Sequence, residues 1–163
     1  MIVREAKLKN GTKEQYLALD EAIQTAQFIR NKAVRFWIDN QGVSKAGLYA
    51  LCKDLAKEFP FAKKLNSAAR QASAERAWAA ISSFYSRCKK GEKKKGYPTF
   101  KKHCRSVEYK VSGWKLSEDC KSITFTDGFE IGTLSIFCNG ETQEDLQTLK
   151  INRVRVVRRA DGY

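Results

Sequence analysis

The sequence predicts an α+β protein in which a helical segment is followed by a small antiparallel sheet or barrel. Apolar residues recur at three- and four-residue spacing up to about residue 90, whereas beyond Gly96 they alternate with polar residues. The dipeptides Asp127-Gly128 and Asn139-Gly140 are hairpin turn signals between the alternating runs. We expect no helix between these strands, which excludes parallel βαβ units.

An opening strand and a long helix come first. The strand covers Ile2–Lys9. Thr12 followed by Gln15 has the spacing of a capping box, so a helix is expected to begin there. Apolar residues then recur at helical spacing for about seven turns, until Asn40-Gln41-Gly42 ends the helix. Its apolar positions are Leu19, Ile23, Ala26, Ala33 and Trp37.

Two further helices are predicted before residue 90. Ser44 can cap a shorter helix, which must stop before Pro60 because proline disfavours a helical residue in front of it. The next helix begins near Asn66 or Ser67. Short connections favour a helical hairpin or a three-helix bundle. The apolar face of this last helix is formed by Ala74, Trp78, Ile81, Tyr85 and Cys88, with Ala77 and Phe84 beside them.

The strands predicted in the second half are short, and the last one carries arginines. Arg153 and Arg155 share one face of it, and Arg159 would join them, so that phosphate contact and simple solvation both remain open. The turn signal Asp161-Gly162 is followed by one residue, which leaves the last strand as an exposed edge. We therefore expect a fragment, an incomplete copy, or a sheet completed by a partner. The alternating runs are Val107–Val111, Ile123–Phe125, Phe129–Ile131, Leu134–Ile136 and Ile151–Val156.

The net charge of +13 is concentrated in one short segment. Residues 88–105 carry eight basic and one acidic side chain, whereas residues 106–163 carry eight basic and nine acidic ones. Phosphates relieve the self-repulsion of such a cluster by counterion release, so nucleic acid is the expected partner. A membrane surface is the weaker alternative, because no helix combines a strongly apolar face with a lysine-rich one. No apolar run approaches the roughly 20 residues of a membrane span, and the charged N-terminus is unlike a signal peptide, which predicts a cytoplasmic protein.

The stretch KKGEKKKGYPTFKK, from Lys89 to Lys102, is the centre of this charge. It is either a solvated linker or a surface that contacts a nucleic-acid backbone. Tyr97 and Phe100 favour the second interpretation, because Pro98 stiffens the chain that presents both rings for stacking or packing. Lysine supplies point charges with little base specificity. The lysines expected to contact phosphates are Lys89, Lys90, Lys93, Lys94, Lys95, Lys101 and Lys102.

Four stretches follow one another in a characteristic order: KLKNGTKEQ (Lys7–Gln15), FIRNKAV (Phe28–Val34), LAKEFPFAKKLNSAARQ (Leu55–Gln71) and GYPTFKKH (Gly96–His103). The last contains a Gly-aromatic-Pro-x-Phe-Lys signature and is the most specific of the four. In this order and spacing they resemble the N-terminal part of the OrfB/TnpB proteins of bacterial insertion sequences. Those transposon-associated proteins are RNA-guided DNA nucleases related to the type V CRISPR effectors. The resemblance covers essentially the whole chain.

The resemblance implies a small wedge-type, OB-like β-barrel that is split in sequence by an inserted helical recognition lobe. Residues 1–11 would hold the first strand, residues 12–90 the lobe, and residues 91–163 the remainder of the barrel. In this family the barrel and the lobe hold a structured guide RNA, and the protein recognises double-stranded target DNA. Catalysis belongs to a RuvC-like domain with divalent metal ions, which is missing from this chain. We expect no cofactor or metal in the chain itself.

The resemblance also assigns roles to polar residues of the helical segment. Ser67 and Gln71 lie four residues apart on one helix face, where the family reads the motif beside its DNA target, and glutamine can pair bidentately with adenine. The alternative roles are helix capping by Ser67 and a surface position for Gln71. Arg70 and Arg76 are expected to contact phosphates or to form surface salt links.

Arg30 and Asn31 lie within the first helix, where asparagine is unfavourable unless a tertiary contact or an RNA contact holds it. No catalytic set emerges, because the carboxylates are scattered and His103 is the only histidine. The five cysteines include no CxxC pair, so zinc is not expected and the thiols are interpreted as reduced.

We therefore expect the guide-RNA and target-DNA binding portion of a TnpB-like nuclease, without a catalytic centre of its own. One alternative is a stand-alone nucleic-acid-binding module, such as a repressor or an RNA-binding accessory protein. The other is an interaction domain whose open edge strand pairs with the missing nuclease portion or with another copy of the chain.

Overall fold

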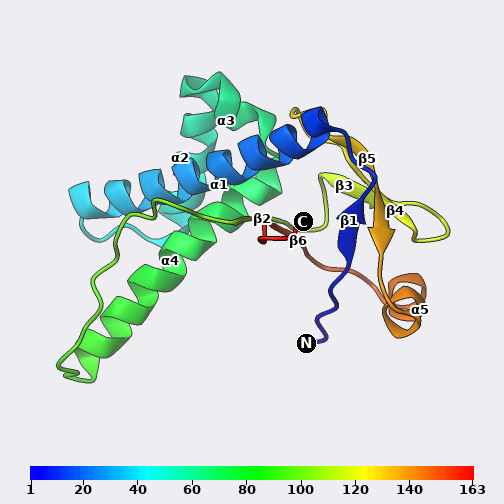
Figure 1. Ribbon diagram of the computed structural model, residues 1–163. Helices are drawn as coiled ribbons and strands as arrows, with labels where there is room; N and C mark the ends of the chain where they lie inside the picture. Colours follow the sequence, from blue (N-terminus) through cyan, green and yellow to red (C-terminus); the bar gives the residue numbers. More distant parts are fainter.

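Helices dominate the first half of the chain and strands the second half, so the predicted α+β class is confirmed (Figure 1). The computed structural model describes residues 1–163. The helices are α1 (Lys13–Asp39), α2 (Lys45–Glu58), α3 (Pro60–Lys64), α4 (Ser67–Lys89) and α5 (Gly140–Thr148). The strands are β1 (Lys7–Lys9), β2 (Ser106–Tyr109), β3 (Trp114–Leu116), β4 (Ser122–Phe125), β5 (Gly132–Phe137) and β6 (Val154–Val157). None of the helices is both long and apolar enough to cross a lipid bilayer.

Short-range polar caps fix the start of each long helix. Thr12 and Gln15 form the predicted capping box, in which Gln15 N–H donates to Thr12 Oγ1 over 3.2 Å and Thr12 N–H donates to Gln15 Oε1 over 3.0 Å. Ser44 caps α2 as predicted. Asn66 caps α4, because its Oδ1 accepts two backbone N–H groups of the first turn. These starts follow from residues only a few positions apart.

The helix α3 was not predicted. Pro60 opens it at the first helical position, where the missing N–H group costs nothing. The helix ends at Lys64, and a segment of five residues is too short to show a helical period in the sequence.

The buried face of α4 is rich in alanine, which lets α1 and α4 pack together along much of their length (Figure 1). Ala69, Ala74 and Ala77 are fully buried, and Ile81 is the large residue among them. The apolar face predicted for α4 was partly wrong, because it included Tyr85, which is 45% exposed. Small side chains give a weak apolar signal in a sequence, although they allow two helix backbones to approach closely.

The strands form two antiparallel sheets and no closed barrel. The larger sheet has the order β1-β5-β4-β3, whereas β2 pairs with β6 alone. The opening strand is shorter than predicted, since only Lys7–Lys9 pair with β5 and the residues before them are exposed. The strand β3 was not predicted. Phe129–Ile131 was predicted as a strand but lies in the loop before β5, where both apolar side chains are nevertheless buried.

The prediction of a hairpin at Asn139-Gly140 was wrong. Asn139 is the N-cap of α5, and its Oδ1 accepts the N–H of Thr142 over 2.8 Å. Asparagine serves turns and helix caps by the same local hydrogen bonding, so the dipeptide alone does not separate the two. A helix consequently lies between β5 and β6, where none was expected. By contrast, Asp127-Gly128 lies in the connection between the antiparallel strands β4 and β5, as predicted.

The Asp127-Gly128 connection joins the sheets to the helical part. Gly128 N–H donates to the carbonyl of Lys64 at the end of α3 over 2.8 Å. The Asp127 Oδ2 atom accepts the Tyr109 hydroxyl over 2.8 Å and lies 3.4 Å from the N–H of Asn66. Burial raises the pKa of Asp127 despite these hydrogen bonds. The turn therefore acts as a structural joint between strands and helices.

The chain after β6 folds back on the molecule. Arg159 N–H donates to the carbonyl of Gly162 over 2.7 Å, so the predicted turn signal does form a turn. The carbonyl of Tyr163 accepts the N–H of Leu8 over 2.9 Å. The Tyr163 ring stacks on Tyr16 with centroids 5.5 Å apart. These contacts link the β2-β6 sheet to the first strand of the larger sheet.

Candidate nucleic-acid interface

We call residues 89–105 the basic segment. It leaves the C-terminal end of α4, turns at Gly91, and runs back beside α4 and across α1 to β2 (Figure 1). The lysines that the sequence marked as phosphate contacts are all exposed. None of them forms an ion pair with a carboxylate. The segment is thus a surface of cations that the protein itself leaves without counter-charge.

Side chains of α1 hold the basic segment in place. Arg30 is only 6% exposed, and its Nη1 donates to the carbonyl of Thr99 over 2.9 Å. Asn31 pairs with the backbone of Lys101, donating from Nδ2 to the carbonyl over 2.8 Å and accepting the N–H at Oδ1 over 2.9 Å. Gln27 accepts the N–H of Cys104 over 2.7 Å. The segment is therefore anchored along one helix face and is not a free linker.

These bonds give Arg30 and Asn31 a structural role. A tertiary contact explains the asparagine within α1, because its amide makes hydrogen bonds that compensate for its poor helix propensity. The sequence left a tertiary contact and an RNA contact open for this residue. The contact of these two residues with nucleic acid remains a prediction.

Asn31→Ala is expected to loosen the basic segment while the protein stays folded. The substitution removes both hydrogen bonds to Lys101 but adds helix propensity. Hydrogen exchange of the Lys101 amide should accelerate by about tenfold, which corresponds to about 1.4 kcal/mol of local stability. Gln24→Ala on the exposed face of α1 is the matched control. An unchanged exchange rate in Asn31→Ala would show that this pairing does not hold the segment.

Glycine is required where the segment passes Arg87. Gly96 has a φ of +62°, a conformation that side chains rarely adopt. A Cβ atom at this position would lie 2.3 Å from Arg87 Nη1. The same Nη1 donates to the carbonyl of Lys95 over 3.0 Å. The glycine therefore lets the guanidinium of Arg87 lie directly against the segment's backbone.

The two predicted aromatic residues have different surroundings. Tyr97 packs between Trp37 and Phe84, with ring centroids 5.4 Å and 5.2 Å away, yet 54% of it remains exposed. Phe100 is 49% exposed and contacts no other aromatic ring. Packing against two rings accounts for one side of Tyr97, whereas Phe100 has no aromatic partner within the protein.

The arginines of the last strand are paired with carboxylates. The cross-strand register places Glu108 opposite Arg155, and Glu108 Oε2 accepts from Arg155 Nη2 over 2.6 Å. Its Oε1 accepts from Arg153 Nη1 over 2.7 Å. Arg159 pairs with Glu5 over 2.6 Å. The sequence did not reveal these pairings, because the carboxylate partners lie on other segments. Their contact with phosphate remains a prediction, and a phosphate would compete with these carboxylates.

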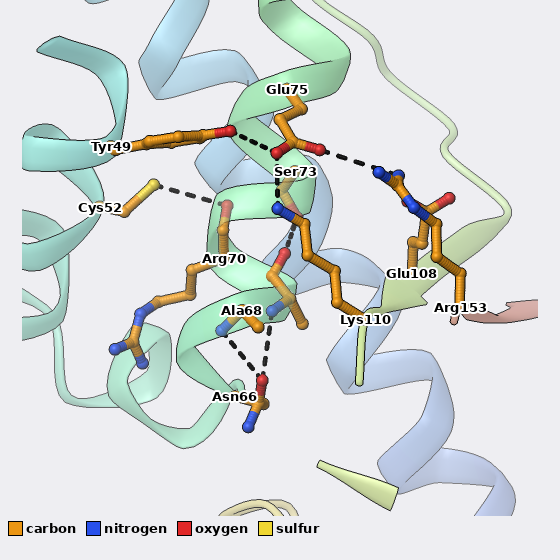
Figure 2. A network of polar contacts seen from close by, with 11 residues as sticks. Tyr49, Cys52, Asn66, Ala68, Arg70, Ser73, Glu75, Glu108, Lys110 and Arg153 are labelled. Atoms are coloured by element: carbon orange, nitrogen blue, oxygen red, sulfur yellow. Dashed lines mark hydrogen bonds and ion pairs between the residues drawn. The ribbon is translucent and has the colours of Figure 1, made fainter. Parts of the chain in front are cut away.

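A second carboxylate, that of Glu75, lies near Glu108 and also faces Arg153 (Figure 2). Glu75 of α4 points between Tyr49 of α2, Lys110 after β2 and Arg153 before β6 (Figure 2). Lys110 Nζ lies 2.5 Å from Glu75 Oε1. Burial would raise the pKa of Glu75, but the hydrogen bonds from Lys110 and Tyr49 lower it overall. Glu75 therefore supplies the counter-charge for Lys110 and for Arg153.

Arg70 and Arg76 donate to backbone carbonyls and form no salt links. Arg70 Nη1 donates to the carbonyl of Leu65 over 2.6 Å and to that of Lys63 over 3.2 Å, so it closes the end of α3. Arg76 Nη1 donates to the carbonyl of Ser106 over 3.0 Å and so joins α4 to β2. Burial lowers the pKa of both guanidinium groups. Their contact with phosphates remains a prediction.

Ser67 and Gln71 keep their polar groups free. The alternative role of Ser67 as the helix cap was wrong, because Asn66 Oδ1 accepts the N–H groups of Ala68 and Ala69 over 2.9 Å and 3.3 Å. Neither Ser67 nor Gln71 makes a side-chain hydrogen bond within the protein. Both side chains are therefore available to an outside partner, and the reading of DNA by them remains a prediction.

The structure brings together no group of three or more histidine, cysteine or acidic side chains that could hold a metal ion. The five cysteines are free thiols. No protein-family model matches the sequence, and the search of curated proteins found no match.

Proposed function

We propose that the chain binds structured RNA through the basic segment, as the guide-RNA and target-DNA binding portion of a TnpB-like RNA-guided nuclease. The observation that carries this proposal is a run of exposed lysines without carboxylate partners, held by Arg30 and Asn31. Anchored cations bind phosphates better than mobile ones, because less conformational freedom is lost on binding. The free side chains of Ser67 and Gln71 support a role in DNA recognition, and divalent metal chemistry would belong to a separate nuclease domain.

We also propose that the two sheets together correspond to the wedge-type barrel that the resemblance implies. The hydrogen bond from Leu8 to the carbonyl of Tyr163 joins both sheets and supports this correspondence. The ring centroids of Tyr109 on β2 and Phe125 on β4 lie 5.4 Å apart, so the two sheets share one core. Closure of the barrel would need further backbone pairing between them.

The proposal predicts strongly salt-dependent binding of structured RNA. Each neutralised phosphate should lower log Kobs by about 0.7 to 0.9 per unit of log salt, because bound counterions are released. Fluorescence anisotropy of a labelled RNA hairpin between roughly 50 and 200 mM salt measures this slope. The absence of binding at low salt, or an affinity that does not change with ionic strength, would overturn the proposal. Sequencing of copurified RNA distinguishes a dedicated guide from the varied RNA expected for a general binding module.

A further inference from the structure

A cavity of about 400 Å³ lies between α4 and the basic segment. One wall is a smooth strip of α4 formed by Ala79, Ala80 and Ser83. The other wall is the backbone around Gly96 and Thr99. The cavity is open to solvent on one side, and its volume leaves room for more than a bare inorganic anion.

The cavity is lined by cations and by no carboxylate. Arg30, Arg87 and Lys101 all contribute to it, and none of them forms an ion pair. Arg30 is almost fully buried, and only its Nη1 makes hydrogen bonds within the protein. Its other guanidinium nitrogens have no hydrogen-bond partner and are not fully buried, so they can donate to an anion in this cavity.

Neutral groups in the lining fit the rest of a nucleotide. Tyr97 borders the cavity and keeps half of its surface exposed, which provides a ring for contact with a base. The Ser83 hydroxyl makes no hydrogen bond within the protein and can bond to a sugar hydroxyl. A phosphate, a sugar and a base therefore each have a matching group.

We infer that this cavity binds one nucleotide of an RNA strand, with its phosphate on Arg30 and Arg87 and its base against Tyr97. This inference rests on the proposed RNA binding and deepens it, because it adds a defined pocket to a charged surface. A contact of this kind contributes affinity that does not depend only on the number of neutralised phosphates.

The test fills the cavity without changing the charge. Ala79 is exposed on α4, and Ala79→Gln places a long neutral side chain in the cavity while keeping good helix propensity. Ala50→Gln, at an exposed position of α2 away from the cavity, is the matched control. Adenosine 5′-monophosphate, adenosine and inorganic phosphate are titrated separately by calorimetry, and the amide NMR signals of Gly96 and Thr99 report the location.

Adenosine 5′-monophosphate is expected to bind more tightly than either of its parts and to shift the amide signals of Gly96 and Thr99. Ala79→Gln should weaken this binding by about tenfold, whereas Ala50→Gln should leave it unchanged. Equal binding of inorganic phosphate and the nucleotide would overturn the inference in favour of a simple anion site. An unchanged nucleotide affinity in Ala79→Gln would also overturn it.

Binding of an RNA hairpin to the same variants tests this inference separately from the proposed function. Ala79→Gln should weaken binding of an RNA hairpin by about tenfold with the same salt slope, because no charge is lost. If the wild-type protein binds RNA and Ala79→Gln binds it equally well, the cavity inference fails and the proposed function stands. If the wild-type protein binds no RNA, the proposed function fails, and the nucleotide titration still decides whether the cavity is a site.

Discussion

Replacement of Lys93, Lys94 and Lys95 together by alanine is expected to weaken RNA binding by about a hundredfold at ~0.1 M salt. A slope of about 0.7 per phosphate corresponds to about 1 kcal/mol per contact at that salt concentration, so three contacts amount to about 3 kcal/mol. The salt slope itself should become shallower by about 2. The melting temperature should not fall, because these side chains are exposed and unpaired and repel one another. Anisotropy titrations at several salt concentrations and a thermal melt measure the three quantities.

The control for this variant removes the same charge elsewhere. Lys53, Lys57 and Lys63 are exposed on α2 and α3, away from the basic segment, and form no ion pairs. Their joint replacement by alanine should leave both the affinity and the salt slope nearly unchanged. An equal loss of affinity in the two triple variants would mean that RNA responds to net charge alone and that the basic segment is not its binding surface.

Glu108→Gln should give the largest loss of stability among single substitutions in the polar networks. Glu108 is 6% exposed and accepts hydrogen bonds from Arg153 and Arg155. Removal of one partner of a buried ion pair costs about 3–5 kcal/mol. Both arginines are more than half exposed and can be solvated, so we expect about 1–3 kcal/mol at pH 7. Urea unfolding of the wild-type and variant proteins measures the difference.

The pH dependence of this difference identifies its origin. Burial would raise the pKa of Glu108, but the hydrogen bonds and charges of Arg155 and Arg153 lower it below the ordinary value of 4.5. A lowered pKa in the folded state contributes stability that is complete above pH 4.5 and is lost as the pH falls through the folded-state pKa. The stability difference between the wild-type protein and Glu108→Gln should therefore shrink below about pH 4.5.

A matched variant separates the effect of the Glu108 charge on stability from the titration of the other carboxylates. Asp127 acts in the opposite direction, because burial raises its pKa and stability then increases as the pH falls towards its ordinary value of 3.8. Glu118→Gln, at an exposed position without hydrogen-bond partners, should show only a small difference in stability. A difference for Glu108→Gln that stays constant down to pH 3 would show that the loss does not come from the carboxylate charge.

The parts of the fold that depend on neighbouring residues could be predicted from the sequence. The starts of α1, α2 and α4 follow from caps within a few positions, and the change from helical to alternating pattern places the strands after Gly96. The length of β1 could not be predicted, because it depends on how far β5 extends beside it. Asn139 could not be interpreted alone, because a helix cap and a turn require the same residue.

The charge of the candidate site could be predicted from the sequence, but the contacts that hold it in place could not. The lysines of the basic segment stand out in the sequence, and they are exposed as expected. The anchoring role of Arg30 was not predictable, because its partner Thr99 lies in a distant part of the chain. For the same reason the sequence did not reveal that Glu108 lies opposite Arg155 on the neighbouring strand. Whether a basic side chain has a partner within the protein depends on residues far away in the sequence, and a local sequence pattern does not show this.

The pairing of Asn31 with Lys101 has a consequence for the order of events during folding. It joins residues that are 70 positions apart in the chain. We expect this loop to close after α1 and α4 have come together, because the basic segment is hydrogen-bonded to both helices. We therefore expect the proposed RNA-binding arrangement to form late, after the helices have packed. A chain that is still folding would attract RNA only through diffuse charge, and the fixed geometry of the interface would distinguish the finished protein from its intermediates.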